Sequence, residues 1–312
     1  MDYIPAKTIV TKTKAPFQWF GIDYNMNIYK GCCHGCIYCD SRSDCYQIED
    51  FGHVRAKENA LQIIRDDLRR KTKSGVVGTG AMSDPYNPFE KELLLTRHAL
   101  ELCDAFGFGM AVATKSTLLE RDIDILQSIA DHSPVLLKVT VTTVDDKLAE
   151  KIEPHAALPD ARFRMIENLS KSGLYTGILL MPVLPFLEDS QENVGEIIRR
   201  AEDVGARFIY PAFEMTLRGS QRDWYFHKLE ELFPGQGLAE KYRKRYGYSY
   251  ECCSPQAKKL WEYFAKECTQ RGIAYRMEDI ISQYKRIPYK ISPSFLQFKF
   301  LLFPCFLPII YV

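Results

Sequence analysis

The sequence has almost no net charge and no long apolar segment near its start. Across 312 residues, 41 Lys and Arg oppose 40 Asp and Glu, which gives a formal net charge of +1. Such a chain has no overall field that attracts a nucleic-acid backbone, so that contact would need a local basic patch. The first residues, Met1 to Lys7, lack the apolar core and the small-residue cleavage site of a signal peptide. We therefore expect a cytoplasmic protein.

An uninterrupted membrane-spanning run is also missing. Residues 293–312 are strongly apolar, but Gln297, Lys299, Pro304 and Pro308 interrupt them. A spanning helix needs about 20 consecutive, predominantly apolar residues. No membrane partner is expected, and the sequence does not indicate a role for this tail.

What the chain does have is the composition of a folded α/β protein. Hydrophobic residues make up 46% and charged residues 26%, close to the average for a globular domain. Short β-rich segments alternate with amphipathic segments of helical length from residue 56 to residue 213. The predicted strands are 25–29, 76–79, 109–114, 135–142, 176–181 and 207–211. The predicted helices are 56–71, 90–106, 121–130, 161–172 and 190–204.

This alternation predicts a partial (β/α)6 barrel of the TIM type, with parallel strands. Nearly continuous apolar runs such as Ile178–Met181 are typical of parallel strands that are covered on both faces. In such sheets the chemistry gathers at the carboxyl ends of the strands.

The alternation stops near residue 217, where a helical C-terminal extension is expected. Its predicted helices are 219–233 and 254–271, with a basic, tyrosine-rich stretch between them and a short strand at 272–276. The predicted organisation is an N-terminal extension (1–24), a barrel core (25–216), the helical extension (217–292) and the apolar tail (293–312).

Four of the ten cysteines fall within eight residues, at positions 32, 33, 36 and 39. The spacing Cys32-x-x-x-Cys36-x-x-Cys39 follows the first predicted strand, in a glycine-containing loop. Soft thiolate ligands suit an iron–sulfur cubane, and a short loop can reach three of its irons. Three ligands leave one iron open to a cofactor or substrate.

Zinc is the alternative ligand for this loop. Structural zinc sites usually combine two Cys-x-x-Cys pairs. Here the second pair is missing, because Cys252 and Cys253 are adjacent. A non-catalytic iron–sulfur or zinc protein therefore stays open as an alternative to an enzyme.

The cysteine loop resembles that of the radical S-adenosylmethionine (SAM) superfamily, in which an aromatic residue, here Tyr38, precedes the last cysteine. The similarity extends to the spore photoproduct lyase-like branch over about residues 20–290. It rests on the runs 27–39, 80–88, 114–116, 121–123, 152–154 and 181–185. The resemblance implies that Cys32, Cys36 and Cys39 hold a [4Fe–4S] cluster whose open iron binds the amine and carboxylate of SAM. Cys33 and Cys45 are set aside as ligands because a fourth thiolate would close that iron.

The resemblance also implies a reaction and an electron donor. One electron from the reduced cluster cleaves SAM to methionine and a 5′-deoxyadenosyl radical, which abstracts hydrogen from a substrate. A flavodoxin or ferredoxin would supply the electron. The protein then has to bind, orient and shield the radical.

Residues at the predicted strand ends are the candidate cofactor contacts, together with Tyr38. Ser83 and Asp84 follow the second strand, and an Asp can accept charge-assisted hydrogen bonds from the cofactor amine. Lys115 ends the third strand and can pair with the cofactor carboxylate. Thr142 ends the fourth strand, within reach of ribose hydroxyls. The structural alternatives are a turn for Ser83-Asp84, a solvated surface lysine, and a threonine that is simply a good strand former.

The substrate is left open by the sequence. Photoproduct lyases carry a cysteine hydrogen donor just before the Ser-Asp segment, whereas this chain has Met82 there. The stretch Lys241–Tyr246 mixes basic and aromatic residues, as nucleic-acid surfaces do, although a solvated helix face would look the same. A nucleic acid is thus one candidate substrate, and a peptide or small metabolite is the other.

Overall fold

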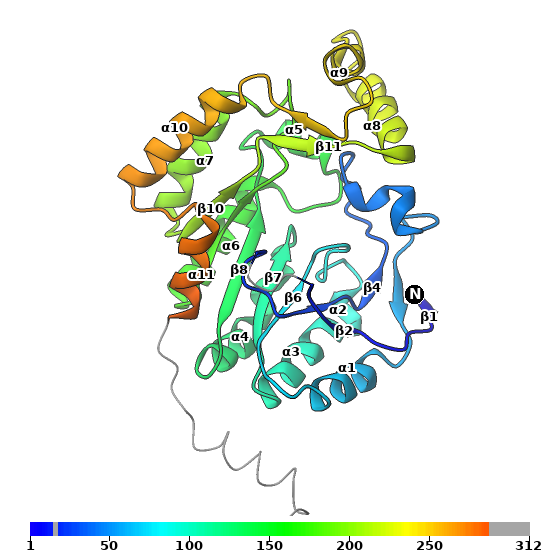
Figure 1. The fold of residues 1–312 in the computed structure, drawn as a ribbon, viewed down its shortest axis with the longest axis vertical. Coiled ribbons are helices and arrows are strands. Elements are labelled where there is room, and N and C mark those ends of the chain that lie inside the picture. Colours follow the sequence, from blue (N-terminus) through cyan, green and yellow to red (C-terminus); the bar gives the residue numbers. More distant parts are fainter. Residues whose placement is uncertain (15–17, 287–312) are drawn as a thin grey trace, which may run out of the picture.

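A seven-stranded sheet forms the centre of the computed structural model, which describes residues 1–14 and 18–286 (Figure 1). The predicted apolar tail, 293–312, lies outside the described residues, as do residues 287–292 of the predicted extension. Across the sheet the strands follow the order β10 (Phe208–Pro211), β9 (Thr176–Leu180), β8 (Val135–Thr140), β7 (Gly109–Thr114), β6 (Val76–Thr79), β3 (Tyr24–Met26) and β2 (Val10–Lys12). Only β2 is antiparallel to its neighbour; the other six strands are parallel. The predicted partial (β/α)6 barrel is confirmed.

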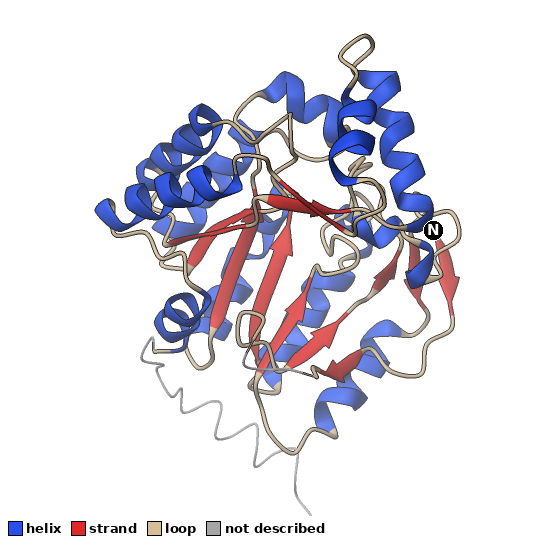
Figure 2. Cartoon of the chain, turned by 45° about the horizontal axis from the view of Figure 1, so that its top comes forward, coloured by secondary structure: helices blue, strands red, loops and turns tan. Residues whose placement is uncertain are grey.

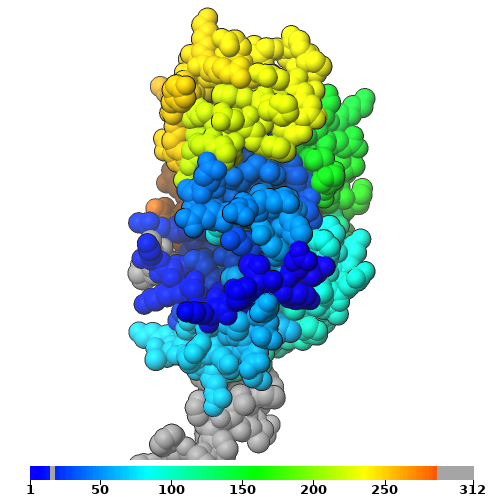
Figure 3. All heavy atoms as spheres, turned by 90° about the vertical axis from the view of Figure 1, so that its right-hand side faces the viewer, coloured from blue at the N-terminus to red at the C-terminus, as the bar shows by residue number. Residues whose placement is uncertain are grey.

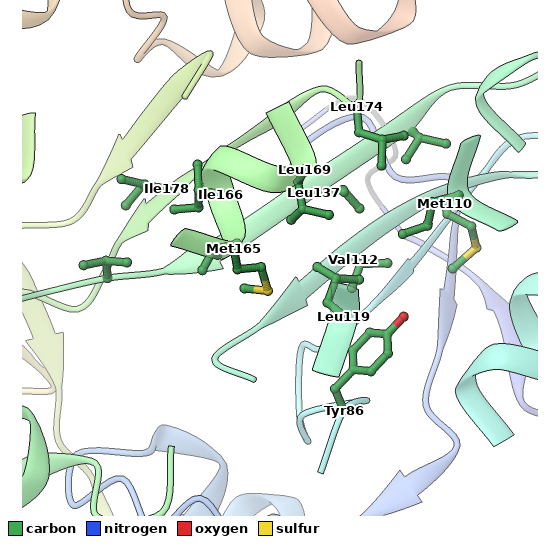
Figure 4. Close-up of a cluster of buried hydrophobic side chains, with 14 of the residues drawn as sticks. Tyr86, Met110, Val112, Leu119, Leu137, Met165, Ile166, Leu169, Leu174 and Ile178 are labelled. Atoms are coloured by element: carbon green, nitrogen blue, oxygen red, sulfur yellow. The ribbon is translucent and has the colours of Figure 1, made fainter. Parts of the chain in front are cut away.

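Helices connect these strands and cover one face of the sheet (Figure 2). In chain order they are α1 (Ala60–Arg69), α2 (Glu90–Leu93), α3 (Leu95–Ala105), α4 (Ile123–Ala130), α5 (Asp146–Ile152), α6 (Pro159–Lys171) and α7 (Gln191–Asp203). Figure 4 shows Leu137 and Ile178 of the sheet near Ile166 and Leu169 of α6, all part of one buried cluster. Such interleaving of apolar side chains is the main stabilising term of this fold.

The opposite face of the strands lines the inside of the partial barrel, which we call the lumen. Side chains alternate along a strand, so every second residue points there. On β8, Leu137 and Val139 join the outer core while Leu136 joins the inner one. Lys138 and Thr140 share the face of Leu136 and therefore point into the lumen.

The structure corrects the predicted strand over 25–29. This stretch divides into β3, in the main sheet, and β4 (Tyr29–Lys30), in a separate sheet with β1 (Asp2–Ile4) and β5 (Arg55–Lys57). The reason is a change of partner: β3 pairs with β6, whereas Tyr29 pairs with Ala56. The change carries the chain away from the main sheet just before the cysteine loop.

Two other predicted elements are also shorter than expected. The helix predicted over 90–106 is interrupted at Leu94, whose left-handed backbone (φ 52°) separates α2 from α3. The strand predicted over 272–276 reduces to one bridge between Ala274 and Phe208, because the chain turns into α11 (Met277–Lys285) directly afterwards.

The C-terminal extension contains α8 (Gly219–Leu232), α9 (Leu238–Tyr246), α10 (Ala257–Gln270) and α11. An antiparallel pair, β11 (Glu214–Thr216) with β12 (Glu251–Cys253), links it to the core, and α8 and α9 lie between the two strands in the chain. The basic stretch between the predicted helices forms α9. Figure 3 shows residues of α8 and α9, in yellow, stacked on the blue segment that follows the cysteine loop. Arg218 binds Asp40 there at 2.6 Å, so the extension stabilises the loop. In the described part of the chain, no helix is long and apolar enough to cross a membrane.

Candidate cluster and cofactor site

The three predicted cluster cysteines line one cavity at the carboxyl ends of the parallel strands. Its volume is about 150 Å³, and all three thiols are free. The other lining residues named by the sequence prediction are Ser83, Asp84 and Lys115. The cavity wall is completed by His34, Ser41, Gly80, Ala81, Met82, Ala113, Thr114, Thr140 and Leu179. The structure thus brings the cysteine loop and two strand ends to one place.

Backbone contacts hold the cysteine loop in shape. The Cys32 amide donates to the Phe51 carbonyl at 2.9 Å, and the Ile37 amide donates to the Ile152 carbonyl at 3.0 Å. Gly31 has a φ of +84°, and a Cβ there would lie 2.6 Å from the His53 carbonyl oxygen. Only glycine fits that position, which explains why it precedes the first ligand.

The donor set fits an iron–sulfur cluster. Burial raises the pKa of the Cys32 thiol to about 12, with a further contribution from the Asp84 carboxylate, and burial likewise raises the pKa of Cys36. Thiols in such surroundings lose their protons when bound metal supplies positive charge. A cluster of iron ions at this loop would provide that charge.

The described residues contain no group of three or more His, Cys, Asp or Glu side chains arranged to hold a single metal ion. Zinc requires all of its ligands around one ion, at about 2.0 to 2.3 Å. In a cubane each thiolate binds a different iron. A cubane therefore does not require the three thiols to surround one ion.

Asp84 joins the ends of β6 and β7. Its carboxylate accepts hydrogen bonds from the Thr114 hydroxyl at 2.7 Å and the Lys115 amide at 2.8 Å. His34 Nε2 of the cysteine loop lies 3.1 Å from the same carboxylate. Burial raises the pKa of Asp84, but the bonds from His34, Thr114 and Lys115 outweigh it and lower the pKa to about 2. Asp84 is therefore a fixed negative charge at the cavity wall.

A second buried carboxylate, Glu153, organises the other side of the loop. Tyr38 donates its hydroxyl hydrogen to Glu153, and Arg162 forms a buried ion pair with it. Lys115 Nζ lies 3.9 Å from Glu153. Burial raises the pKa of Glu153, but the positive charges of Arg162 and Lys115 lower it by more. The pKa of Glu153 is therefore lowered overall. These contacts fix the ring of Tyr38 directly before the third cysteine.

Ser83 and Thr142 have protein partners in the structure. Ser83 donates to the Tyr29 carbonyl at 3.0 Å, and Thr142 donates to Glu188 at 2.7 Å. Burial raises the pKa of Glu188 to about 8. Thr140, one inner position earlier on β8, lines the cavity. The cofactor contacts of Ser83 and Thr142 remain predictions.

Sequence reasoning assigned no role to several residues of this site. Glu153 lies in the Ile-Glu-Pro run that carried part of the resemblance, so that motif was the available signal. Arg162, nine residues later on α6, carried no sequence signal because its pairing depends on the tertiary fold.

Other candidate residues lie away from the loop ligands. Cys45 is exposed and Cys103 is buried on α3. Tyr86 is buried and donates to Asp122 at 3.0 Å.

Comparisons with known proteins agree with this arrangement. A family model described as "Radical SAM superfamily" matches residues 26–207. An uncharacterized protein of Mycobacterium tuberculosis (strain ATCC 25618 / H37Rv) is 31% identical over 231 residues, which cover 72% of this chain and 67% of the relative. An uncharacterized protein of Methanocaldococcus jannaschii is 29% identical over 234 residues, covering 74% of this chain and 83% of that protein.

Solved structures show the same fold. A spore photoproduct lyase complexed with dinucleoside spore photoproduct superposes with a TM-score of 0.58 and 15% identity, covering 87% of this chain and 80% of that one. A radical SAM methyltransferase from Kitasatospora setae gives a TM-score of 0.52 at 11% identity, covering 79% of this chain and 51% of that one. With the family match over more than half of its length, the chain belongs to the radical SAM superfamily, whose cofactors are a [4Fe–4S] cluster and S-adenosylmethionine.

Proposed function

We propose that this protein reductively cleaves SAM and uses the resulting 5′-deoxyadenosyl radical to abstract hydrogen from a substrate. The observation that carries the proposal is the single cavity shared by three free cysteines, Asp84 and Lys115. Cys32, Cys36 and Cys39 would hold the cluster. When bound, the reduced cluster supplies the electron that breaks the C5′–S bond of SAM and releases methionine.

Asp84 and Lys115 supply opposite charges for the two ends of the methionyl group. Asp84 keeps its negative charge and can accept hydrogen bonds from the amine, alongside Ser83. Lys115 keeps its positive charge: burial lowers its pKa, but Cys36 and Glu153 raise it more. We assign the carboxylate to Lys115, and the ribose to the β8 end near Thr142. Tyr38, held by Glu153, positions the loop.

For the substrate we propose a nucleic acid, as in the lyase whose structure contains a dinucleoside photoproduct. Support on this chain comes from α9, where Lys241, Lys244 and Arg245 are exposed. Tyr248, just after α9, is 95% exposed and available for stacking. Tyr242 of the same stretch is buried and donates to the Pro185 carbonyl, so it contributes to the core. A lyase-type reaction would need a hydrogen donor other than a cysteine at the position of Met82.

We keep a flavodoxin or ferredoxin as the proposed electron donor, and the cytoplasm as the proposed location. All nine described cysteines are free, as expected where thiols stay reduced. A peptide or small metabolite remains the second candidate substrate, and it gains weight if the nucleic-acid test below fails.

The proposed reaction is tested by anaerobic reconstitution with iron and sulfide, followed by reduction in the presence of SAM. Release of 5′-deoxyadenosine and methionine in equal amounts supports it. Deuterated candidate substrates then show which molecule transfers deuterium to 5′-deoxyadenosine. A fully loaded cluster that leaves SAM intact would overturn the proposal and favour the non-catalytic alternative.

Nucleic-acid binding is tested with single-stranded and duplex DNA at several salt concentrations. Changing Lys241, Arg243, Lys244 and Arg245 to Gln should weaken binding. It should also make the slope of log K against log salt concentration shallower, by about 0.9 per lost phosphate contact on duplex DNA and about 0.7 on single-stranded DNA. The control changes the exposed Lys258 and Lys259 of α10 to Gln. Equal binding by both variants contradicts a role for α9.

A further inference from the structure

Lys138 is a lysine inside the barrel that the cluster site does not use. It lies on the inner face of β8, between Leu136 and Thr140, and its side chain is only 3% exposed. Thr140 lines the cluster cavity, and it is one inner position, roughly 7 Å, further along the strand. Lys138 therefore projects into the lumen beside the cavity that would hold SAM.

The ammonium group of Lys138 has no acceptor among the described residues. Its one described polar contact is the face of the Phe20 ring, at 4.6 Å from Nζ to the ring centroid. Burial alone lowers the pKa of Lys138 to about 7, with no contribution from a neighbouring charge. Titratable groups on the surrounding elements are either tyrosines or already paired: Asp23, Lys115, Tyr175, Tyr210, Tyr284 and Lys285.

Small residues flank Lys138 in the sheet, and larger side chains pack over two of these positions. In the sheet register its neighbours are Ala113 on β7 and Gly177 on β9. Ala111 and Gly78 occupy inner positions on the adjoining strands, with Ile22 packed over Gly78 and Phe208 packed over Gly177. Aromatic rings of Phe20, Tyr210 and the 44% exposed Trp19 contact one another at the side of this space.

A purely structural role does not explain this lysine. Burying an amine without a partner costs free energy, and buried charges in proteins are normally paired. The other lysine of the region, Lys115, has such a partner in Glu153. An unpaired buried amine beside a reaction site is therefore a marker of a ligand that completes it.

We propose that Lys138 binds an anionic group of the substrate, a phosphate or a carboxylate, inside the lumen. This inference rests on the proposed radical reaction and names the class of molecule that undergoes it. The anion would pair with the protonated amine. Anchored there, the substrate would present a C–H bond on the cavity side, within the region that Thr140 and Leu179 share with the cluster loop.

The test uses reconstituted protein loaded with SAM and two probe anions, sulfate for the phosphate arm and acetate for the carboxylate arm. Both keep their charge across the pH range used. Because only protonated Lys138 binds an anion well, affinity should fall about 30-fold between about pH 6 and pH 8.5. The preferred probe distinguishes a phosphate from a carboxylate substrate.

Three variants complete the test. Lys138→Met should weaken the preferred anion at least about tenfold at pH 6, and Lys138→Arg should restore binding without the pH dependence, because arginine stays charged. Lys171→Met, on the exposed side of α6, is the control and should bind as the wild type does. Equal binding by Lys138→Met and the wild type, or no saturable binding by the wild type, overturns the proposal.

Substrate-independent SAM cleavage is measured on the same samples, because it reports on the proposed function alone. It should persist in Lys138→Met. Cleavage without Lys138-dependent anion binding contradicts the anion site only. Loss of cleavage in the wild type contradicts the radical reaction, whatever the anion result. Loss in Lys138→Met alone would place Lys138 in the cofactor site and overturn this inference.

Discussion

The cluster end of the barrel and the lumen beside it differ in whether their buried charged side chains have partners. At the cluster end Asp84, Glu153, Arg162 and Lys115 all have partners, and each of the four keeps its charge. In the lumen Lys138 has none among the described residues, and burial alone lowers its pKa to about 7. The contrast between Lys115 and Lys138 shows that a partner, more than depth, decides whether a lysine stays charged. The charges at the cluster end are therefore neutralised within the protein, whereas the proposed substrate anion would neutralise Lys138 in the lumen.

The largest expected effect comes from breaking the paired end. Glu153→Leu leaves Arg162 buried without its carboxylate and should lower the free energy of unfolding by about 3–5 kcal/mol. Urea denaturation of the reconstituted protein measures it. Glu167→Gln, which removes the exposed pair with Lys171, is the control and should cost at most about 1 kcal/mol. A loss below that value for Glu153→Leu would mean that the network does not stabilise the loop.

Asp84 provides a smaller, pH-dependent effect. Its pKa is lowered from 3.8 to about 2, so its contribution is present above pH 4 and is lost as the pH falls towards 2. Asp84→Asn should therefore remove about 2 kcal/mol of stability at neutral pH and make acid unfolding shallower between pH 4 and 2. Unfolding curves at stepped pH measure this. Parallel curves for both proteins would contradict the assigned pKa.

Replacing Lys138 should raise the stability of the protein, whereas replacing Asp84 should lower it. The folded protein releases a proton near pH 7 that the unfolded chain keeps up to about 10.5, so stability gains from this group as the pH rises between those values. Lys138→Met should be more stable than the wild type near pH 7. The difference between the two should shrink by about 1.4 kcal/mol per pH unit above that pH. A constant difference from pH 7 to 10 would mean that Lys138 has a partner.

The smallest effect concerns Arg42, which follows the third cysteine. Its guanidinium lies over the Trp224 ring at 4.3 Å and over the Phe51 ring at 5.1 Å, and it interacts with the Cys39 thiol. Removing a positive charge disfavours the more negative, reduced cluster. Arg42→Met should therefore lower the midpoint potential by less than about 60 mV, the one-electron equivalent of a tenfold change. An anaerobic redox titration measures it, and a higher potential would contradict the account.

Much of the fold and part of the site follow from the sequence. The apolar runs and their spacing predict six parallel strands, and the cysteine loop identifies the end where residues of β6 and β7 meet it. The break between β3 and β4 was missed because both pieces have strand-like sequences and only the pairing partner changes. Glu153 and Arg162 come together through α5 and α6 packing. Lys138 was missed because a lysine within an apolar strand carries no sign of whether it has a partner.

The central claim, that Cys32, Cys36 and Cys39 hold the catalytic cluster, is tested most directly by comparing two neighbouring cysteines. Cys36→Ala and Cys33→Ala are reconstituted in parallel, and iron content and 5′-deoxyadenosine release are measured. We predict that Cys36→Ala loses the cluster and all SAM cleavage, whereas Cys33→Ala keeps both. Retained cleavage in Cys36→Ala, or equal loss in the two variants, would contradict the assignment.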